Sequence, residues 1–400
     1  MELNIEQQKA LRLAIERYKD GYPYTYIAGA AGTGKSFLVQ HIVAALGFDP
    51  ATDVCYATYT GKAALNLQRK NCPNAHTLHR LLYNARQNKN TGIYYFTPKP
   101  IGELKKEYEL IVIDEISMVT QEMWKLLLEH GVHVIALGDI AQLPAIGASN
   151  DILEKPHAVL TEIMRQEADS EIIQIATLAR NHEPIPFMKG KQVQVLHNYE
   201  FQESMIDWSD MTLCATNKLR YQLNETARKR KWGDAKALPQ KGDRIVCLHN
   251  EWDEITKAGD VLVNGLVGFI NTPPRINDMP SLYRKYCEKQ ILLDFVPDYQ
   301  VDNPEGVFRN MKADYKIFTE GIPTINEKNF KFVPKVLRPY QFDYAYALTC
   351  HKAQGSEYDK VLVFWESYPS GDMMYKWIYT AITRAVKKLV IIDCRGGINL

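Results

Sequence analysis

Short apolar runs recur through the first 140 residues, and each ends in small or polar residues. The runs Thr25–Ala28, Val54–Thr58, Leu110–Ile113 and Val132–Leu137 each have the length of a buried strand. Between them lie segments with helical spacing, such as Glu6–Tyr18, whose apolar residues recur every three or four positions. This alternation predicts an α/β fold built on a parallel sheet.

A second α/β region follows the first. Apolar positions recur at a period of 3.6 after residue 171, and the run Met211–Cys214 precedes a helix that ends near Arg230. Strands are predicted again at Lys360–Trp365 and Leu389–Asp393, on either side of a helix over 376–385. We therefore expect a first domain over 1–170 and a second over 171–238 and 339–400.

Two segments interrupt this pattern. Asn-rich sequence around Tyr94, Tyr95 and Phe96 predicts a small β-hairpin inserted over about 84–107. Its aromatic side chains would either stack on nucleic-acid bases or fix the hairpin to its domain, and both interpretations stay open. Residues 239–338 are rich in Pro, Gly and short alternating strands, which predicts a small β-barrel-like insertion.

Composition narrows the class of protein. The length of 400 residues predicts two or three domains, and the net charge of +1 provides no overall field for polyanions. Seven scattered cysteines without a C-x-x-C pair favour reduced thiols, no zinc and a cytoplasmic location. No apolar run reaches the length of a membrane helix, and the N-terminus lacks a signal-peptide core.

One stretch has a pattern specific for phosphate binding. It fits G-x-x-x-x-G-K-[ST] and lies between a predicted strand and a predicted helix. Small residues let successive N–H groups surround phosphate oxygens, while the lysine reaches the β and γ phosphates and the serine holds Mg²⁺. The stretch consists of Gly29, Ala30, Ala31, Gly32, Thr33, Gly34, Lys35 and Ser36.

Polar residues at the ends of other strands complete an NTPase pattern. Asp114 and Glu115 follow a buried strand, where the first would bind Mg²⁺ through water and the second would deprotonate the attacking water. Gln142 follows the next strand and could sense the γ-phosphate. Arg165 is either a surface ion-pair partner or an arginine finger. Gln7 is either an adenine contact or a solvated helix residue.

Other polar residues suit a phosphodiester backbone without being specific for it. Thr60 and Lys62 follow a strand, and His79 lies at a predicted helix start. The spacing of His76 and His79 does not support a metal site. The basic run Arg228–Lys231 is interpreted as a solvated helix C-terminus.

Together these motifs resemble the superfamily 1 DNA helicases of the 5′-to-3′ branch, of the Dda and RecD type. The resemblance runs from Gln7 to Arg384 and implies two RecA-like domains with ATP between them and single-stranded DNA across their tops. It implies that Gln7 reads adenine, that Gln142 is the coupling glutamine of this family, and that Arg165 and Arg384 are arginine fingers. Gly355 would lie near the γ-phosphate and Glu357 near the ribose.

The resemblance also implies a DNA track. Thr60, Lys62 and His79 would contact the strand from the first domain, and Thr349, His351 and Lys352 from the second. The hairpin matches the pin that splits the duplex, with Phe96 as the wedge by position. The 239–338 insertion resembles the SH3-like domain of this family.

We expect from this an ATP-dependent DNA helicase that moves 5′-to-3′ on single-stranded DNA and opens forked duplexes, with ATP and Mg²⁺ as cofactors. A monomer is expected, with a single-strand-binding or replisome protein as a further partner. Replication, recombination and repair stay open as pathways, and so does RNA as a track. The alternatives are a DNA-stimulated ATPase that acts as a switch or remodeller without processive unwinding, and a P-loop kinase of small molecules.

Overall fold

The computed structural model describes residues 2–69, 72, 74–87, 94–144, 151–163, 170–234, 238–279, 281, 284, 287–325 and 337–397. The chain divides into two compact units. The first comprises Met1–Asn84, Thr97–Phe201 and Ala353–Ile398, and the second comprises Ala85–Phe96, Gln202–Lys352 and Asn399–Leu400. The domain bounds expected at 170, 238 and 338 stay a prediction.

The first unit contains a fully parallel sheet of six strands in the order β3-β2-β6-β7-β1-β8. Successive side chains of the central strands face opposite cores, which explains their continuous apolar sequence. The strands are β1 (Tyr24–Gly29), β2 (Val54–Thr58), β3 (Ala75–Thr77), β6 (Leu110–Ile113), β7 (His133–Gly138) and β8 (Ala158–Leu160). The predicted α/β fold with a parallel sheet is confirmed.

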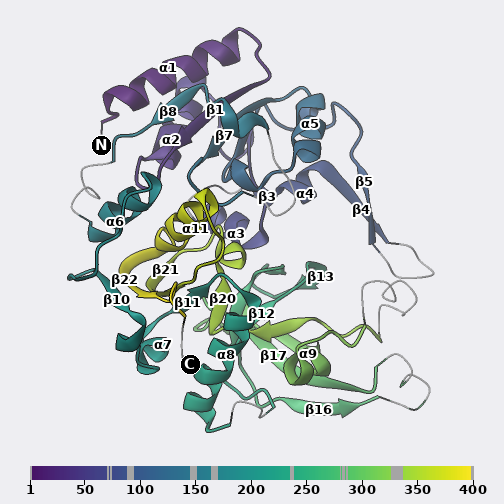
Figure 1. Cartoon of the computed structure of the whole chain (residues 1–400). Helices are drawn as coiled ribbons and strands as arrows, with labels where there is room; N and C mark the ends of the chain where they lie inside the picture. Colours follow the sequence, from purple (N-terminus) through teal and green to yellow (C-terminus); the bar gives the residue numbers. More distant parts are fainter. Residues whose placement is uncertain are drawn as a thin grey trace. The chain divides into compact units, whose positions relative to one another are not determined.

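Helices cover both faces of this sheet. On one face α1 (Ile5–Lys19) and α2 (Lys35–Leu46) share a core with Ile27, Val112 and Leu137, and the two helices lie together beside β1 and β8 (Figure 1). On the other face α4 (Leu78–Leu82) and α5 (Gln121–Glu129) share a core with Ile113. A further helix, α3 (Gly61–Arg69), follows β2.

A second group of strands lies in the first unit. Three of them, β10, β22 and β21, are parallel neighbours, and β9 pairs antiparallel with β10. Helices α6 and α11 contact each other beside these strands. The bounds are α6 (Glu171–Arg180), β9 (Met188–Lys189), β10 (Val193–His197), β21 (Tyr358–Trp365), α11 (Asp372–Ile382) and β22 (Ala385–Asp393).

The second unit begins with α7 (Ser204–Trp208), β11 (Met211–Cys214) and α8 (Asn217–Trp232). β20 (Ala347–Thr349) pairs with β11 in parallel. Thr216 caps α8 at its start, and Gly233 ends the helix in the left-handed conformation.

The interpretation of Arg228 as solvated is wrong. Its guanidinium is 1% exposed and lies 3.3 Å from the buried carboxylate of Asp243. Arg228 falls on the buried face of α8, next to Ala227 and one turn after Asn224, so the helical period turns this one basic residue inward. Lys229 and Arg230 are exposed as expected.

The strands of the insertion, together with β19 just after it, form an antiparallel sheet in the order β16-β17-β15-β12-β19, with β18 on β17. A separate pair is formed by β13 and β14, and α9 (Tyr315–Glu320) follows β18. The strands are β12 (Arg244–Cys247), β13 (Glu251–Ile255), β14 (Val261–Leu262), β15 (Val267–Ile270), β16 (Arg275–Asp278), β17 (Lys289–Pro297), β18 (Phe308–Asp314) and β19 (Phe342–Tyr344). The SH3-like assignment stays a prediction.

The predicted hairpin is confirmed as a two-stranded sheet of β4 (Tyr83–Gln87) and β5 (Tyr94–Pro98). The side chain of Phe96 lies outside the described residues, so its role as the wedge stays a prediction. Across the described part of the chain, no helix is both long enough and apolar enough to span a membrane.

Candidate functional site

The phosphate loop joins the end of β1 to the start of α2. Gly32 and Gly34 have φ angles of +78° and +75°, which side chains rarely adopt. A Cβ on Gly29 would lie 2.6 Å from Thr33 Oγ1, so no side chain fits at that position. The hydroxyl of Thr33 donates to the carbonyl of Ala30 at 2.9 Å. The loop is thus closed on itself ahead of a helix N-terminus, the geometry that binds phosphate.

The ammonium of Lys35 lies over this loop. It donates to the carbonyl oxygens of Gly29 at 2.7 Å and Ala30 at 3.0 Å. An ammonium has three N–H donors, so these two bonds hold the cation at the loop and leave a donor for a phosphate oxygen.

The acidic pair follows β6 at the same edge of the sheet. Glu115 has a φ of +57°, and its N–H donates to Asp114 Oδ1 at 3.0 Å. Burial and the neighbouring Asp114 carboxylate raise the pKa of Glu115, while Arg384 and Lys35 act to lower it. Asp139 acts in the raising direction. A glutamate held in the left-handed region is strained, which is a common feature of functional sites.

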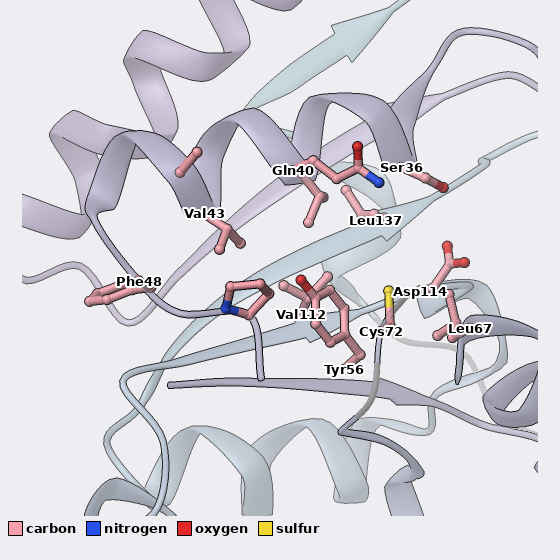
Figure 2. Close-up of a pocket in the computed structure, with 13 residues that line it drawn as sticks. Ser36, Gln40, Val43, Phe48, Tyr56, Leu67, Cys72, Val112, Asp114 and Leu137 are labelled. Atoms are coloured by element: carbon pink, nitrogen blue, oxygen red, sulfur yellow. The ribbon is translucent and has the colours of Figure 1, made fainter. Parts of the chain in front are cut away.

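Ser36 and Asp114 border the same cavity of about 520 Å³ beneath α2. Figure 2 shows both side chains at one end of this cavity, with Gln40 nearby and Phe48 at the far end. A hydroxyl and a carboxylate are ligands that suit Mg²⁺, which keeps several waters and binds substrate phosphates. No cluster of three or more His, Cys, Asp or Glu side chains that could hold a metal occurs among the described residues.

The end of β7 supplies a third set of polar groups. Asp139 is buried, and its Oδ1 accepts from the N–H of Ala141 at 3.0 Å. Gln142 is also buried, and its N–H donates to the carbonyl of Asp139. A Cβ on Gly138 would lie 2.5 Å from Ile116 Cγ2, so the acidic segment and this strand end approach closely.

Helix α11 contacts the segments that follow β1 and β7. The Tyr379 hydroxyl accepts from the N–H of Ala31 at 3.0 Å and donates to Asp139 Oδ2. Next to it, Thr380 Oγ1 accepts from the N–H of Leu143 at 2.9 Å, and the Gln354 amide donates to the carbonyl of Leu143 at 2.8 Å. Sequence reasoning missed these residues. The only available signal was that Tyr379 and Thr380 lie in the run that ends at Arg384.

Arg384 follows α11 and is 5% exposed. Its guanidinium donates to the carbonyls of Thr380 and Ser356 and to the Thr383 hydroxyl. These contacts hold the cation in place, and it acts to lower the pKa of Glu115. Arg165 lies outside the described residues.

Gln7 is fully buried at the start of α1. Its Oε1 accepts from the N–H of Asn4 at 3.0 Å, while its Nε2 donates to the carbonyl of Thr33 at 3.0 Å. The expected alternative of a solvated helix residue is therefore wrong, because the amide serves as a helix cap and as a support of the phosphate loop. Adenine contact stays a prediction.

Gly355 lies against the start of α3. With a φ of +71°, it approaches so closely that a Cβ would lie 3.3 Å from Thr60 Oγ1 and 3.1 Å from the Ala63 side chain. Its expected place near the γ-phosphate stays a prediction, as does the ribose contact of Glu357, whose side chain is exposed.

The expected DNA contacts of the first unit have defined surroundings. Thr60 Oγ1 accepts from the N–H of Ala63 at 3.2 Å and so caps α3. The His79 ring packs between Tyr59 and Tyr83, with centroids 5.6 and 6.0 Å away, and burial lowers its pKa. The lowered pKa favours the neutral form of the His79 ring at pH 7. The side chain of Lys62 lies outside the described residues.

In the second unit, three expected DNA contacts lie together at the end of β20. Thr349 is buried, and the 3₁₀ turn Cys350–Ala353 carries His351 and Lys352. Burial lowers the pKa of His351. Loss of hydration and the nearby positive charge of Arg220 lower the pKa of Lys352, while the carboxylate of Asp343 acts to raise it.

Residues 2–201 match the family model described as the AAA domain, and residues 344–392 match the UvrD-like helicase C-terminal domain. A relative from Deinococcus radiodurans, ATP-dependent RecD2 DNA helicase, is 32% identical over 39% of this chain and 21% of its own. ATP-dependent DNA helicase dda of Enterobacteria phage T4 is 28% identical over 44% of this chain and 42% of its own. The chain thus spans less than half the length of these two relatives.

Among solved structures, Pif1 helicase from Bacteroides in complex with ADP-AlF3 and single-stranded DNA has a TM-score of 0.55 at 17% identity, covering 98% of this chain and 92% of that one. A structure of two coordinating Pif1 helicases at forked duplex DNA also has a TM-score of 0.55, at 19% identity and with the same coverage. At these identities the likeness concerns the fold. With half of its residues matched by one family model, the chain belongs to the AAA domain family and resembles the superfamily 1 helicases of the 5′-to-3′ branch.

Proposed function

We propose that this chain is an ATP-dependent DNA helicase that moves 5′-to-3′ on single-stranded DNA and separates duplex DNA. The observation that carries the proposal is the geometry of the nucleotide site, in which Lys35 is held on the phosphate loop and Ser36 and Asp114 border one cavity. Names of relatives add support, because two of them are ATP-dependent DNA helicases.

The phosphate loop binds the nucleotide in this proposal. Its N–H groups and the start of α2 provide the anion site, and Lys35 turns its remaining donor toward the β and γ phosphates. Ser36 and Asp114 are the residues that would hold Mg²⁺. The bound ion would neutralise phosphate charge and orient the triphosphate.

Hydrolysis requires a base and fixed positive charge. Glu115 orients and deprotonates the attacking water. A general base is most effective when its pKa lies near the working pH, and the raised pKa of Glu115 moves in that direction. Arg384 stabilises charge on the transferring phosphoryl group from its buried position. Gln142 and Arg165 are assigned to γ-phosphate contact as further proposals.

The DNA strand is held through its backbone. Thr60, Lys62 and His79 are proposed as contacts of the first RecA-like domain, and Thr349, His351 and Lys352 as contacts of the second. Contacts to phosphate and sugar carry little sequence information, so the helicase would act on any sequence. We assign the pin to the β4–β5 hairpin and propose a monomer as the acting form, with a single-strand-binding or replisome protein as a further partner.

Tailed duplexes test the proposal directly. With ATP and Mg²⁺, a duplex with a 5′ single-stranded tail should be separated, while a blunt duplex or one with only a 3′ tail should not. Lys35→Ala should abolish separation because the loop loses its cation, and Lys19→Ala, which removes an exposed lysine of α1, should not. ATPase activity stimulated by DNA without strand separation would instead support the switch or remodeller.

A further inference from the structure

The Tyr379 hydroxyl lies between the phosphate loop and the end of β7. It accepts from the N–H of Ala31 and donates to the carboxylate of Asp139, and its side chain is 2% exposed. Burial and the nearby Asp139 carboxylate raise the pKa of Tyr379, so the phenol stays protonated at neutral pH and remains a donor to that carboxylate. A single hydroxyl is thus held at a fixed point by two partners.

The donor to this hydroxyl belongs to the phosphate-binding loop itself. Ala31 is the third residue of the loop, whose N–H groups form the anion site. A straight, short hydrogen bond from an N–H has one acceptor, so the phenol oxygen and a phosphate oxygen would compete for this donor. Packing alone does not require that a tyrosine take a donor from the anion site.

We propose that Tyr379 is a positioning residue that holds α11 on the nucleotide-free phosphate loop and is displaced by the phosphates of an incoming nucleotide. This inference rests on the proposed function insofar as it takes the loop to bind nucleotide. It adds a regulatory element to that site, because nucleotide must break a hydrogen bond within the protein before it can bind fully.

The displacement has a defined effect on Arg384. The neighbour of Tyr379 on α11, Thr380, accepts from the Arg384 guanidinium through its carbonyl and from the Leu143 N–H through its hydroxyl. Release of Tyr379 from Ala31 therefore loosens the segment that positions the arginine. Occupation of the loop is in this way transmitted to the cation that acts on the γ-phosphate.

Nucleotide affinity tests the proposal, and the direction of the change is decisive. Binding of Mg·ADP and of a non-hydrolysable ATP analogue is measured by titration calorimetry without DNA. Tyr379→Phe should bind both nucleotides about three- to tenfold more tightly than wild type, since the competing hydrogen bond is gone. The same variant should melt at a lower temperature, because Asp139 loses a donor. Unchanged or weaker binding would overturn the proposal and leave Tyr379 a structural residue.

A matched control lies one turn earlier on the same helix. The Tyr375 ring stacks on His182 with centroids 4.4 Å apart, and Tyr375→Phe should leave nucleotide affinity unchanged. If that variant tightened binding equally, the effect would not come from the Ala31 contact and the proposal would be wrong.

A second variant covers the case in which Tyr379→Phe does not fold. Thr380→Val keeps the Tyr379 hydroxyl and removes the neighbouring bond to Leu143, so it should tighten binding in the same direction and by less. Weaker nucleotide binding in Thr380→Val would count against the proposal that Tyr379 holds α11 on the phosphate loop. Failure of the wild type to bind any nucleotide would instead refute the proposed function.

Discussion

The side-chain amide of Gln7 donates a 3.0 Å hydrogen bond to the main-chain carbonyl of Thr33 and so joins the first helix to the phosphate loop. The same amide accepts from Asn4 in a reciprocal cap at the helix start. One buried side chain thus fixes both the helix and the loop.

Gln7→Ala should lower the free energy of unfolding by about 1 to 3 kcal/mol, because the buried carbonyl of Thr33 loses its donor. Chemical denaturation measures the change. Gln8→Ala is the matched control, since Gln8 makes an exposed bond to Leu3 and its loss should cost little. Equal effects of the two variants would contradict the support given to the loop by Gln7.

Arg228→Ala should cost about 3 to 5 kcal/mol of stability, because it leaves the buried Asp243 carboxylate without its ion-pair partner. Thermal or denaturant unfolding tests this directly. Lys229→Ala removes an exposed cation from the same basic run and should change stability by less than about 0.5 kcal/mol. A small effect at Arg228 would mean that Asp243 is held by its other partners, which include Trp232, Tyr346 and the N–H of Gln240.

Glu115→Gln should retain nucleotide binding and lose roughly a hundredfold or more of ATP hydrolysis, since the amide cannot accept the proton of the attacking water. Single-turnover hydrolysis and nucleotide titration together measure the two effects. Binding that fell in parallel with hydrolysis would show that Glu115 also holds the nucleotide, against the division of roles with Asp114.

The pH dependence of stability has a definite sign for this carboxyl. Burial and Asp114 raise the pKa of Glu115, so between its unfolded and folded pKa values the native state binds more protons than the unfolded state. The resulting stabilisation is present at low pH and is lost as pH rises through the folded pKa. In nucleotide-free protein without Mg²⁺, Glu115→Gln should therefore melt above wild type at neutral pH, and this difference should shrink on acidification. A difference that is independent of pH would contradict the raised pKa.

Phe96→Ala should slow strand separation while leaving DNA-stimulated ATPase nearly intact, because loss of a base stack costs roughly 1 to 3 kcal/mol only at the fork. Unwinding of a tailed duplex and ATPase on single-stranded DNA are measured in parallel. Tyr94→Ala and Tyr95→Ala identify which of the three aromatics acts. If Phe96→Ala lowers both activities together with the melting temperature, the residue fixes the hairpin and does not act as a wedge.

Local pattern was sufficient for the strands, the phosphate loop and the acidic pair. In each of these, an apolar run ends at the edge of a parallel sheet, so chain order alone brings Ser36 and Asp114 together. The contacts of Tyr379 were not predictable in this way. Its hydroxyl meets Ala31 across 348 positions of sequence, and such a contact depends on how two sheets pack their helices.

Burial of individual polar residues was predicted less well for a related reason. Gln7 and Arg228 are ordinary surface types on helices, and each is turned inward by helical phase and then satisfied by a partner far along the chain. Sequence shows the phase but not the partner. When the partner is unknown, the sequence does not show whether a polar residue at the boundary of the buried face of a helix is buried or solvated.

The position of β1 has a consequence for synthesis of the chain. β1 pairs on one side with β7 and on the other with β8, where Gly29 is opposite Leu160. A ribosome adds about 5 to 20 residues per second, so the loop after β1 waits on the order of ten seconds for its second flanking strand. Both edges of β1 are unpaired until β7 is made, and one edge stays unpaired until β8 is made, although the nascent chain already carries the complete phosphate-binding motif. The sheet that supports the phosphate loop is therefore completed only when about the first 160 residues have been made, well before α11.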